Sequence, residues 1–171
     1  GIVKWVFEII VTLVFAVLVA ISAFQTVTLQ ESAMEPTYSV SEKFFVNRAL
    51  YKVSSPKRGD VIVFKTSASD SAALHIRRVI GLPGETVQVK DGKIYINGKV
   101  YEENGAYQDM TDGGLANSAI TLESGEYFVL GDNRNNSEDS RFSDIGNISK
   151  KYIVGKVWFT VSPKNKIGFI K

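Results

Sequence analysis

One polar loop holds residue types that could bind or position a reactive group. The stretch GDNRNNSEDSR, from Gly131 to Arg141, contains two Asp, two Arg, three Asn, one Glu and two Ser among eleven residues. A segment this polar stays ordered through internal hydrogen bonds and ion pairs, and Asp139 lies two residues from Arg141 as a candidate pair. Calcium is an alternative ligand, but the EF-hand spacing is absent and Arg134 and Arg141 oppose a divalent cation. The pattern predicts an ordered polar loop without a metal.

Two further stretches carry side chains that suit chemistry on a peptide. The stretch ESAMEPT (31–37) follows a long apolar segment, and HIRRVIGLPGE starts at His75, the single histidine of the chain. Because side chains alternate along a strand, His75 and Arg77 fall on one face of this stretch and Arg78 falls on the other. The chain has no cysteine, which excludes disulfides, a thiol nucleophile and thiolate metal sites.

Four stretches in this order, AMEPT, RGDVIVFK, RRVIGLPGE and GDNRNNSEDSR, resemble the sequence boxes of type I signal peptidases of the Gram-positive type. The resemblance spans Gln25 to about Val161, and the last box is the most specific. It implies a mainly β, antiparallel catalytic domain with a small β insertion and one N-terminal transmembrane helix. It also implies a hydrolase, a serine endopeptidase without cofactors, that removes signal peptides from exported preproteins at the outer face of the membrane.

The chain departs from this family at both catalytic positions. The family's boxes read Ser-Met-x-Pro-Thr and Lys-Arg-Val-Ile-Gly, with the serine as nucleophile and the lysine as general base. Here Ala33 stands at the nucleophile position and Arg77 at the base position. A Ser–Lys dyad needs an attacking hydroxyl and an amine that is neutral at the working pH. Alanine has no hydroxyl and arginine stays protonated in proteins, so the chain is predicted to be inactive.

The resemblance assigns supporting roles to six residues: Arg78, Asp132, Asn133, Ser137, Asp139 and Arg141. Ser137 matches a serine that hydrogen-bonds and orients the lysine, while Asp139 and Arg141 match the structural pair of the last box. Asp132 and Asn133 are expected to hold the loop.

Substrate contacts are implied for four residues around the nucleophile position: Glu31, Ser32, Met34 and Pro36. Met34 is expected to line the pocket for the small residue before the cleavage site, and Pro36 to fix the following turn. Glu31 replaces a glycine or hydroxyl residue that serves the oxyanion in the family. The backbone N–H of Ala33 therefore remains as the expected oxyanion donor.

A substitute dyad of Ser32 and His75 is an alternative route to catalysis. It requires the two side chains to come within hydrogen-bond reach. We disfavour it because a one-residue step along an extended segment turns Ser32 away from the position of Ala33. His75 is then expected to be a surface or packing residue.

Two explanations for Ala33 and Arg77 stay open, together with a hybrid in which a natural Arg77 is combined with an engineered Ala33. One is deliberate disabling: Ser→Ala is the smallest deletion of the hydroxyl, Lys→Arg keeps the charge but removes the base, and the chain opens with Gly1. The other is natural loss of catalysis with the peptide groove retained. Signal peptidase-like proteins of that kind are associated with pilus assembly in Gram-positive bacteria, so the partners would be pilus subunits and a sortase. The loss of both dyad members favours this second explanation, because one engineered change would suffice.

The N-terminus is predicted to be a membrane anchor over residues 1–25, in contact with lipid. The segment from Ile2 to Phe24 is apolar apart from a few residues, and about 20 apolar residues suffice to span a bilayer. Lys4 can reach the headgroups and Trp5 suits the interface. A cleaved signal and a buried core helix are the alternatives. Lys4, ahead of the apolar run, places the N-terminus in the cytoplasm and the remainder outside the cell membrane.

The remainder of the chain is predicted to be β-structure. Runs of β-branched and aromatic residues alternate with turn signals such as PGE, DGK and NGK, and KDGKIYINGKVY predicts a hairpin turning at Asn97-Gly98. We expect a catalytic core over residues 26–84 and 125–171 and a small insertion or cap over residues 85–124. A formal charge of +2 without a basic stripe argues against nucleic acid as a partner.

Overall fold

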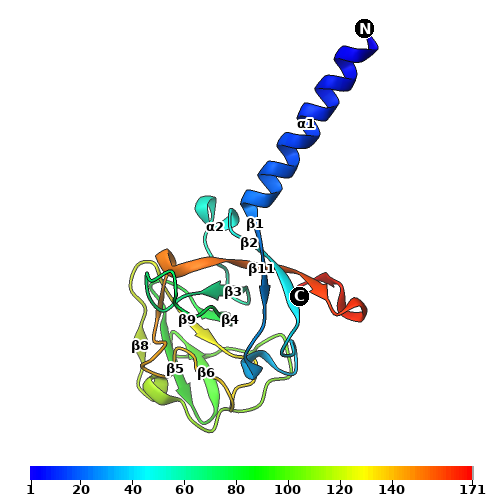
Figure 1. The fold of residues 1–171 in the computed structure, drawn as a ribbon. Helices are drawn as coiled ribbons and strands as arrows, with labels where there is room; N and C mark the ends of the chain where they lie inside the picture. The colour runs from blue at the N-terminus through cyan, green and yellow to red at the C-terminus, as the bar shows by residue number, and fades with distance from the viewer. Residues whose placement is uncertain (171) are drawn as a thin grey trace.

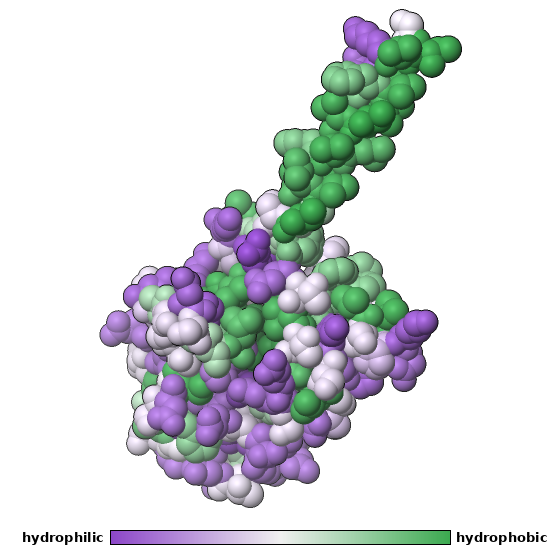
Figure 2. Space-filling model, viewed as in Figure 1, coloured by the Kyte–Doolittle hydropathy of each residue, from purple (hydrophilic) through white to green (hydrophobic). Residues whose placement is uncertain are grey.

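The computed structural model describes residues 1–170, and its longest element is the helix α1 (Ile2–Ala23), which extends away from a β-sheet body (Figure 1). None of its residues is buried, and its surface is apolar along nearly its whole length (Figure 2). The helix is long and apolar enough to cross a membrane. Arg48 fixes its end: its backbone N–H donates to Ala23 O and its guanidinium to Ser22 O, both at 2.8 Å. A cation at this position also complements the helix dipole.

The main sheet has eight strands, and each strand pairs with its neighbours in antiparallel fashion. In spatial order they are β1 (Phe24–Thr28), β2 (Lys43–Asn47), β11 (Ile153–Ser162), β3 (Val61–Phe64), β4 (His75–Gly81), β9 (Glu126–Leu130) and β10 (Ile148–Ser149), with β12 (Gly168–Phe169) on β11. Register shifts interrupt β4 and β11. Such bulges add local twist, and the sheet curls around its core.

A second sheet is inserted between β4 and β9, which are neighbours in the main sheet. Its order is β7 (Lys99–Val100), β6 (Lys93–Ile96), β5 (Thr86–Lys90) and β8 (Ile120–Thr121). The hairpin predicted at Asn97-Gly98 is confirmed, with φ of 51° and 76° at these two residues. Two consecutive positive φ values are what a tight type I′ turn requires.

The two sheets share one apolar core. Ile80 of β4 and Phe128 and Leu130 of β9 pack in the same buried cluster as Val87 of β5 and Ile94 of β6. An ion pair fastens this junction, because Arg58 donates to both carboxylate oxygens of Glu85 at 2.5 and 2.8 Å. The inserted sheet is therefore fixed against the strands that carry β4 and the polar loop after β9.

Short helical turns complete the chain: η1 (Ser32–Met34), α2 (Leu50–Val53), η2 (Gly114–Asn117), η3 (Lys150–Tyr152) and η4 (Lys164–Lys166). The mainly antiparallel β architecture predicted from the sequence is confirmed. The differences lie at the edges. The apolar runs TVTLQ (26–30) and KVWFTVS (156–162) predict strands, and the structure begins β1 at Phe24 and β11 at Ile153, two and three residues earlier. The two-residue strands β8, β10 and β12 were not predicted. Strands this short carry no alternation that a sequence can show.

Candidate active site

The first part of the site is the turn η1, which follows β1. Ala33 and Met34 are both buried, but Ala33 lines a cleft while Met34, at 0 % exposure, packs in the core with Tyr38 and Phe44. The extended geometry that we expected for this stretch is therefore wrong. The lining role expected for Met34 is also not seen, because the tight turn sends its side chain inward. Ser32 lines the same cleft beside Ala33.

The polar loop after β9 holds this turn in place. The backbone N–H of Asn133 donates to Ala33 O at 2.9 Å, and its side-chain amide donates to Ser32 O at 3.1 Å. The amide of Asn136 donates to the Ser32 hydroxyl at 3.2 Å. Two segments about a hundred residues apart in sequence thus form one wall, which fits the loop-holding role expected for Asn133.

The cleft between these elements has a volume of about 700 Å³. Its lining includes Ala33 from η1, Arg77 from β4 and Ser137 from the polar loop. These are the three positions at which the family resemblance puts nucleophile, base and orienting hydroxyl. A concave site of this size can hold a short peptide segment.

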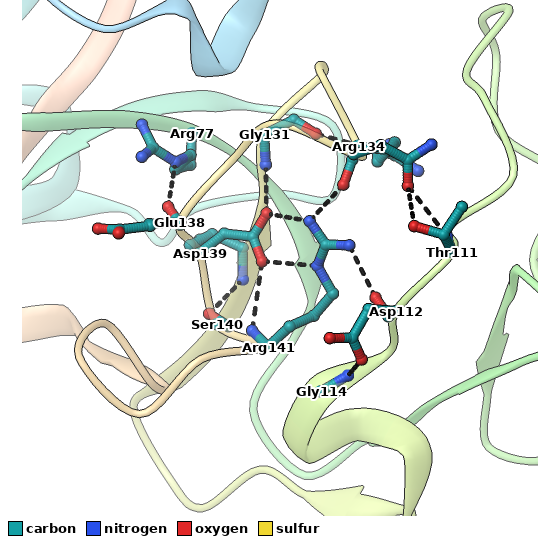
Figure 3. Close-up of polar contacts among 12 residues, drawn as sticks. Arg77, Thr111, Asp112, Gly114, Gly131, Arg134, Glu138, Asp139, Ser140 and Arg141 are labelled. Atoms are coloured by element: carbon teal, nitrogen blue, oxygen red, sulfur yellow. Dashed lines mark hydrogen bonds and ion pairs between the residues drawn. The ribbon is translucent and has the colours of Figure 1, made fainter.

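The Arg77 guanidinium is 1 % exposed, and two of its nitrogens donate to backbone carbonyls rather than to Ser137. Its Nε donates to Glu138 O and a terminal nitrogen donates to Ile76 O, both at 2.8 Å; Figure 3 draws the first of these bonds. The Ser137 hydroxyl is buried and has no hydrogen-bond partner among residues 1–170. Arg77 thus lines the same cleft as Ala33 and Ser137, but no hydrogen bond joins its guanidinium to the Ser137 hydroxyl among the described residues. An unsatisfied buried hydroxyl is rare and calls for an explanation.

Arg77 also contacts the carboxylate of Glu31, and no pattern in the sequence indicates this contact. One terminal nitrogen lies 2.6 Å from Glu31 Oε2, and the other Glu31 oxygen lies 3.0 Å from His75 Nδ1. The His75 ring stacks on Phe64 at 5.6 Å between centroids. His75 is therefore bound to Glu31 through Nδ1, whereas the Ser32 hydroxyl accepts from Asn136, and among the described residues no hydrogen bond joins Ser32 to His75. The sequence placed His75 and Arg77 on one strand face, which indicated that they share an environment. It gave no sign that Glu31 joins them, because Glu31 lies 44 residues from His75.

The electrostatics of Glu31 follow from these contacts. Burial alone raises the pKa of its carboxyl, but the hydrogen bond with His75 and the charge of Arg77 outweigh burial and lower the pKa from 4.5 to about 2. Glu31 is therefore ionised at any pH at which the protein works, and the Glu31–Arg77 pair is charged on both sides.

This pair makes stability depend on pH. The folded-state pKa lies below that of the unfolded chain, so the stabilisation is present above about pH 4.5 and is lost as the pH falls toward about 2. Glu31→Gln is expected to lower the free energy of unfolding at neutral pH by about 1–2 kcal/mol, less than for a fully buried pair because the Glu31 side chain is 37 % exposed. Glu31→Gln should also make the free energy of unfolding fall less steeply as the pH is lowered into the acid range. Denaturant unfolding of the detergent-solubilised chain measures both effects, and the exposed Glu102→Gln is the control. A profile unchanged by Glu31→Gln would mean that the pair contributes nothing in solution.

The interior of the polar loop is built on a second ion pair (Figure 3). Arg141 donates to both oxygens of Asp139 at 2.8 and 2.9 Å, and these residues are 2 % and 0 % exposed. Asp139 also accepts from the Gly131 N–H at 3.1 Å, while Arg141 donates to Arg134 O at 2.6 Å and to Asp112 O at 3.0 Å. The pair predicted from their spacing is confirmed, and it ties the loop to the inserted segment.

Two further arginines near the loop pair with acidic side chains. Arg78 donates to both oxygens of Asp132 at 2.8 and 2.6 Å. Burial alone lowers the pKa of the Arg78 guanidinium, but this bidentate contact raises it above its ordinary value. Arg134 pairs with Glu103 and lies 4.2 Å from the centre of the Tyr107 ring. No pattern in the sequence indicates this role for Arg134. Among the described residues no group of three His, Asp or Glu side chains could hold a metal.

Pro36 lies outside the main cleft. It lines a neighbouring cavity of about 540 Å³ together with Thr37, Arg78 and Tyr107, between the turn and the inserted segment. The residues expected to contact substrate therefore divide, with Glu31 and Ser32 on the main cleft and Pro36 on the second cavity.

Comparison with known proteins supplies the family. Residues 2–162 match the family model described as signal peptidase, peptidase S26. Signal peptidase I of Bacillus licheniformis is 34 % identical over 96 % of this chain and 90 % of its own length, and signal peptidase I of Bacillus amyloliquefaciens is 36 % identical over 98 % and 91 %. A crystal structure of a signal peptidase I from Enterococcus faecalis superposes with a TM-score of 0.49 at 32 % identity, over 61 % of this chain and 98 % of the other. The chain belongs to the signal peptidase I family, peptidase family S26.

Proposed function

We propose that this chain is a membrane-anchored signal peptidase I whose Ser–Lys dyad is disabled, with Ala33 at the nucleophile position and Arg77 at the base position. The observation that carries the proposal is the cleft that brings Ala33, Arg77 and Ser137 together from three separate elements. The orphaned Ser137 hydroxyl supports it, because a lysine amine at position 77 would be a natural partner for that oxygen.

The chemistry explains why two changes suffice to stop the reaction. In a Ser–Lys dyad the hydroxyl oxygen bonds to the scissile carbonyl carbon while its proton passes to the neutral amine. The amine then returns that proton to the departing nitrogen as the peptide C–N bond breaks. The Ala33 methyl has no lone pair and no proton to give, and the Arg77 guanidinium is already protonated. Both steps lack their reacting group.

The proposed substrates are the signal peptides of exported preproteins. The helix α1 would hold the cleft close to a membrane, with the β body on the outer face and the N-terminus in the cytoplasm. Glu31 and Ser32 would contact the peptide beside position 33, and Asp132, Asn133, Asp139 and Arg141 would support the loop. The segment 85–124 would act as a cap on the core that spans 26–84 and 125–171.

A reversion series tests this proposal. The chain itself, Ala33→Ser, Arg77→Lys and the double variant are assayed in detergent, from neutral to alkaline pH, on a preprotein with a small-x-small cleavage site. We expect no cleavage by the chain or by either single variant, because each lacks one partner of the dyad, and cleavage by the double variant. A preprotein with a bulky residue before the cleavage site is the substrate control. Cleavage by the unaltered chain would contradict the disabled dyad.

A second candidate is a non-catalytic assembly factor that binds pilus subunits alongside a sortase. The observation that favours it is that both dyad positions differ and that Arg77 is held by its own counter-ion, Glu31. Such a protein keeps the groove and binds peptides without cutting them. A double variant that binds the preprotein but stays inert over the whole pH range would make this the better assignment.

A further inference from the structure

The carboxylate of Glu31 faces the position at which the family has its general base. One Glu31 oxygen lies 2.6 Å from an Arg77 terminal nitrogen and the other lies 3.0 Å from His75 Nδ1. The Arg77 guanidinium is 1 % exposed and the Glu31 Oε2 atom is buried, so little water reaches this contact although the Glu31 side chain as a whole is 37 % exposed. Arg77 and its counter-ion Glu31 therefore form an ordered ion pair in the wall of the cleft.

Glu31 has little freedom to leave this position. It directly precedes η1, and the Asn133 N–H holds that turn through Ala33 O at 2.9 Å. Its second oxygen is bound to His75, which lies on the same strand as Arg77. The other charged groups that line the cleft, Glu138 and Asp144, are exposed acids that add negative charge.

We propose that Glu31 is a third disabling feature of this site, a carboxylate that would hold a lysine at position 77 in its charged form, so that restoring the dyad alone leaves the base switched off at neutral pH. The inference rests on the proposed function, because it concerns the base of that same reaction. It assigns Glu31 as a positioning residue that acts through position 77.

The geometry supports this assignment. A lysine side chain ends at the atom that corresponds to the Arg77 Cζ, one bond short of the nitrogen that meets Glu31. The ammonium would therefore lie beside the carboxylate, and an opposite charge at that range favours the protonated amine by about 1–3 pH units. Burial of the amine, and a charge on His75 when it is protonated, would lower the pKa of this lysine. The carboxylates of Glu138 and Asp144, like that of Glu31, would raise it. Each unit by which the pKa of this lysine rises lowers the fraction of neutral amine, the form that the reaction needs, about tenfold.

The pH dependence of cleavage is the first readout. The double variant Ala33→Ser/Arg77→Lys is compared with the triple variants that add Glu31→Gln or Glu31→Asp. We expect the ascending limb of kcat/KM, where activity rises with pH as the lysine loses its proton, to move to lower pH by about one unit or more with Glu31→Gln, and the rate at neutral pH to rise about tenfold or more. Glu31→Asp keeps the charge and should keep the limb close to that of the double variant.

A readout that does not require catalysis separates this inference from the proposed function. Lysine labelled with ¹³C at Cε reports the titration of the amine at position 77, assigned as the signal that Arg77→Lys introduces, and a dispersed spectrum shows that each variant is folded. We expect this amine to titrate at lower pH in the Glu31→Gln variant than in the double variant. The same titration midpoint in both folded variants would overturn the inference, whether or not either cleaves. A shifted midpoint without cleavage by either variant would sustain the role of Glu31 and contradict the peptidase assignment instead.

Discussion

Asp139→Ala is expected to lower the free energy of unfolding by about 3–5 kcal/mol, because it leaves the Arg141 guanidinium buried without a counter-ion. Both residues lie at 2 % exposure or less, and the pair is bidentate at 2.8 and 2.9 Å. The change also strips the Gly131 N–H of its acceptor. Denaturant unfolding of the full chain in detergent, followed by tryptophan fluorescence, measures the loss.

A double-mutant cycle identifies the cause. Asp139→Ala combined with Arg141→Met removes the unpaired charge and should recover part of the loss, with a coupling energy of about 1–3 kcal/mol. Recovery should be incomplete because Arg134 O and Asp112 O lose their donor. The control is Asp70→Ala on an exposed loop, where we expect a change within about 0.5 kcal/mol. A loss at Asp139 as small as at Asp70 would show that the pair does not support the loop.

Gly131→Ala is expected to disrupt the packing of the polar loop against the turn η1. A Cβ at this position would lie 2.1 Å from the Ser137 hydroxyl oxygen and 2.5 Å from Ala33 O. The Ala33 carbonyl belongs to the backbone and accepts from the Asn133 N–H, so it cannot retreat without breaking the contact between turn and loop. We expect a loss of about 3 kcal/mol in stability. In the Ala33→Ser/Arg77→Lys background, cleavage should fall by about a hundredfold, because the reacting groups are displaced.

Gly168→Ala is the matched control, because no atom lies within 4 Å of a Cβ built there. Adding Ser137→Ala to Gly131→Ala should not rescue the protein, since Ser137 Cβ and Ala33 O each still lie 2.5 Å from the new methyl group. Normal stability of Gly131→Ala, with undiminished cleavage when it is added to Ala33→Ser/Arg77→Lys, would mean that the close approach of loop and turn is not needed.

Asp139→Ala and Gly131→Ala test the contacts that shape the cleft. Asp139 and Arg141 set the shape of the loop, and Gly131 lets the loop approach η1 closely enough for Asn133 to hold Ala33 O. The cleft is therefore shaped by contacts that do not depend on the residue types at positions 33 and 77. Under the proposed function, these contacts would keep a surface shaped for a peptide in a chain that does not cleave it.

Several features of this protein follow from the sequence by itself. A long apolar run determines α1, because its length and composition leave few other structures open. Alternating β-branched runs and the Asn97-Gly98 turn determine most of the strands, since these signals are local. The spacing of Asp139 and Arg141 made them a candidate ion pair, which the structure confirms, and the residue types at positions 33 and 77 lack the hydroxyl and the neutral amine of a Ser–Lys dyad.

The tertiary structure alone decided how these residues meet. Met34 turned into the core and Ser32 toward the cleft because the backbone of η1 forms a tight turn, which depends on the contact of Ala33 O with Asn133 far along the chain. Arg77 left the Ser137 hydroxyl unpaired and took Glu31 as its counter-ion because the fold places that carboxylate beside β4. Contacts between residues 44 or more positions apart leave no periodic signal in a single sequence, so packing rather than pattern determined the electrostatics of the site.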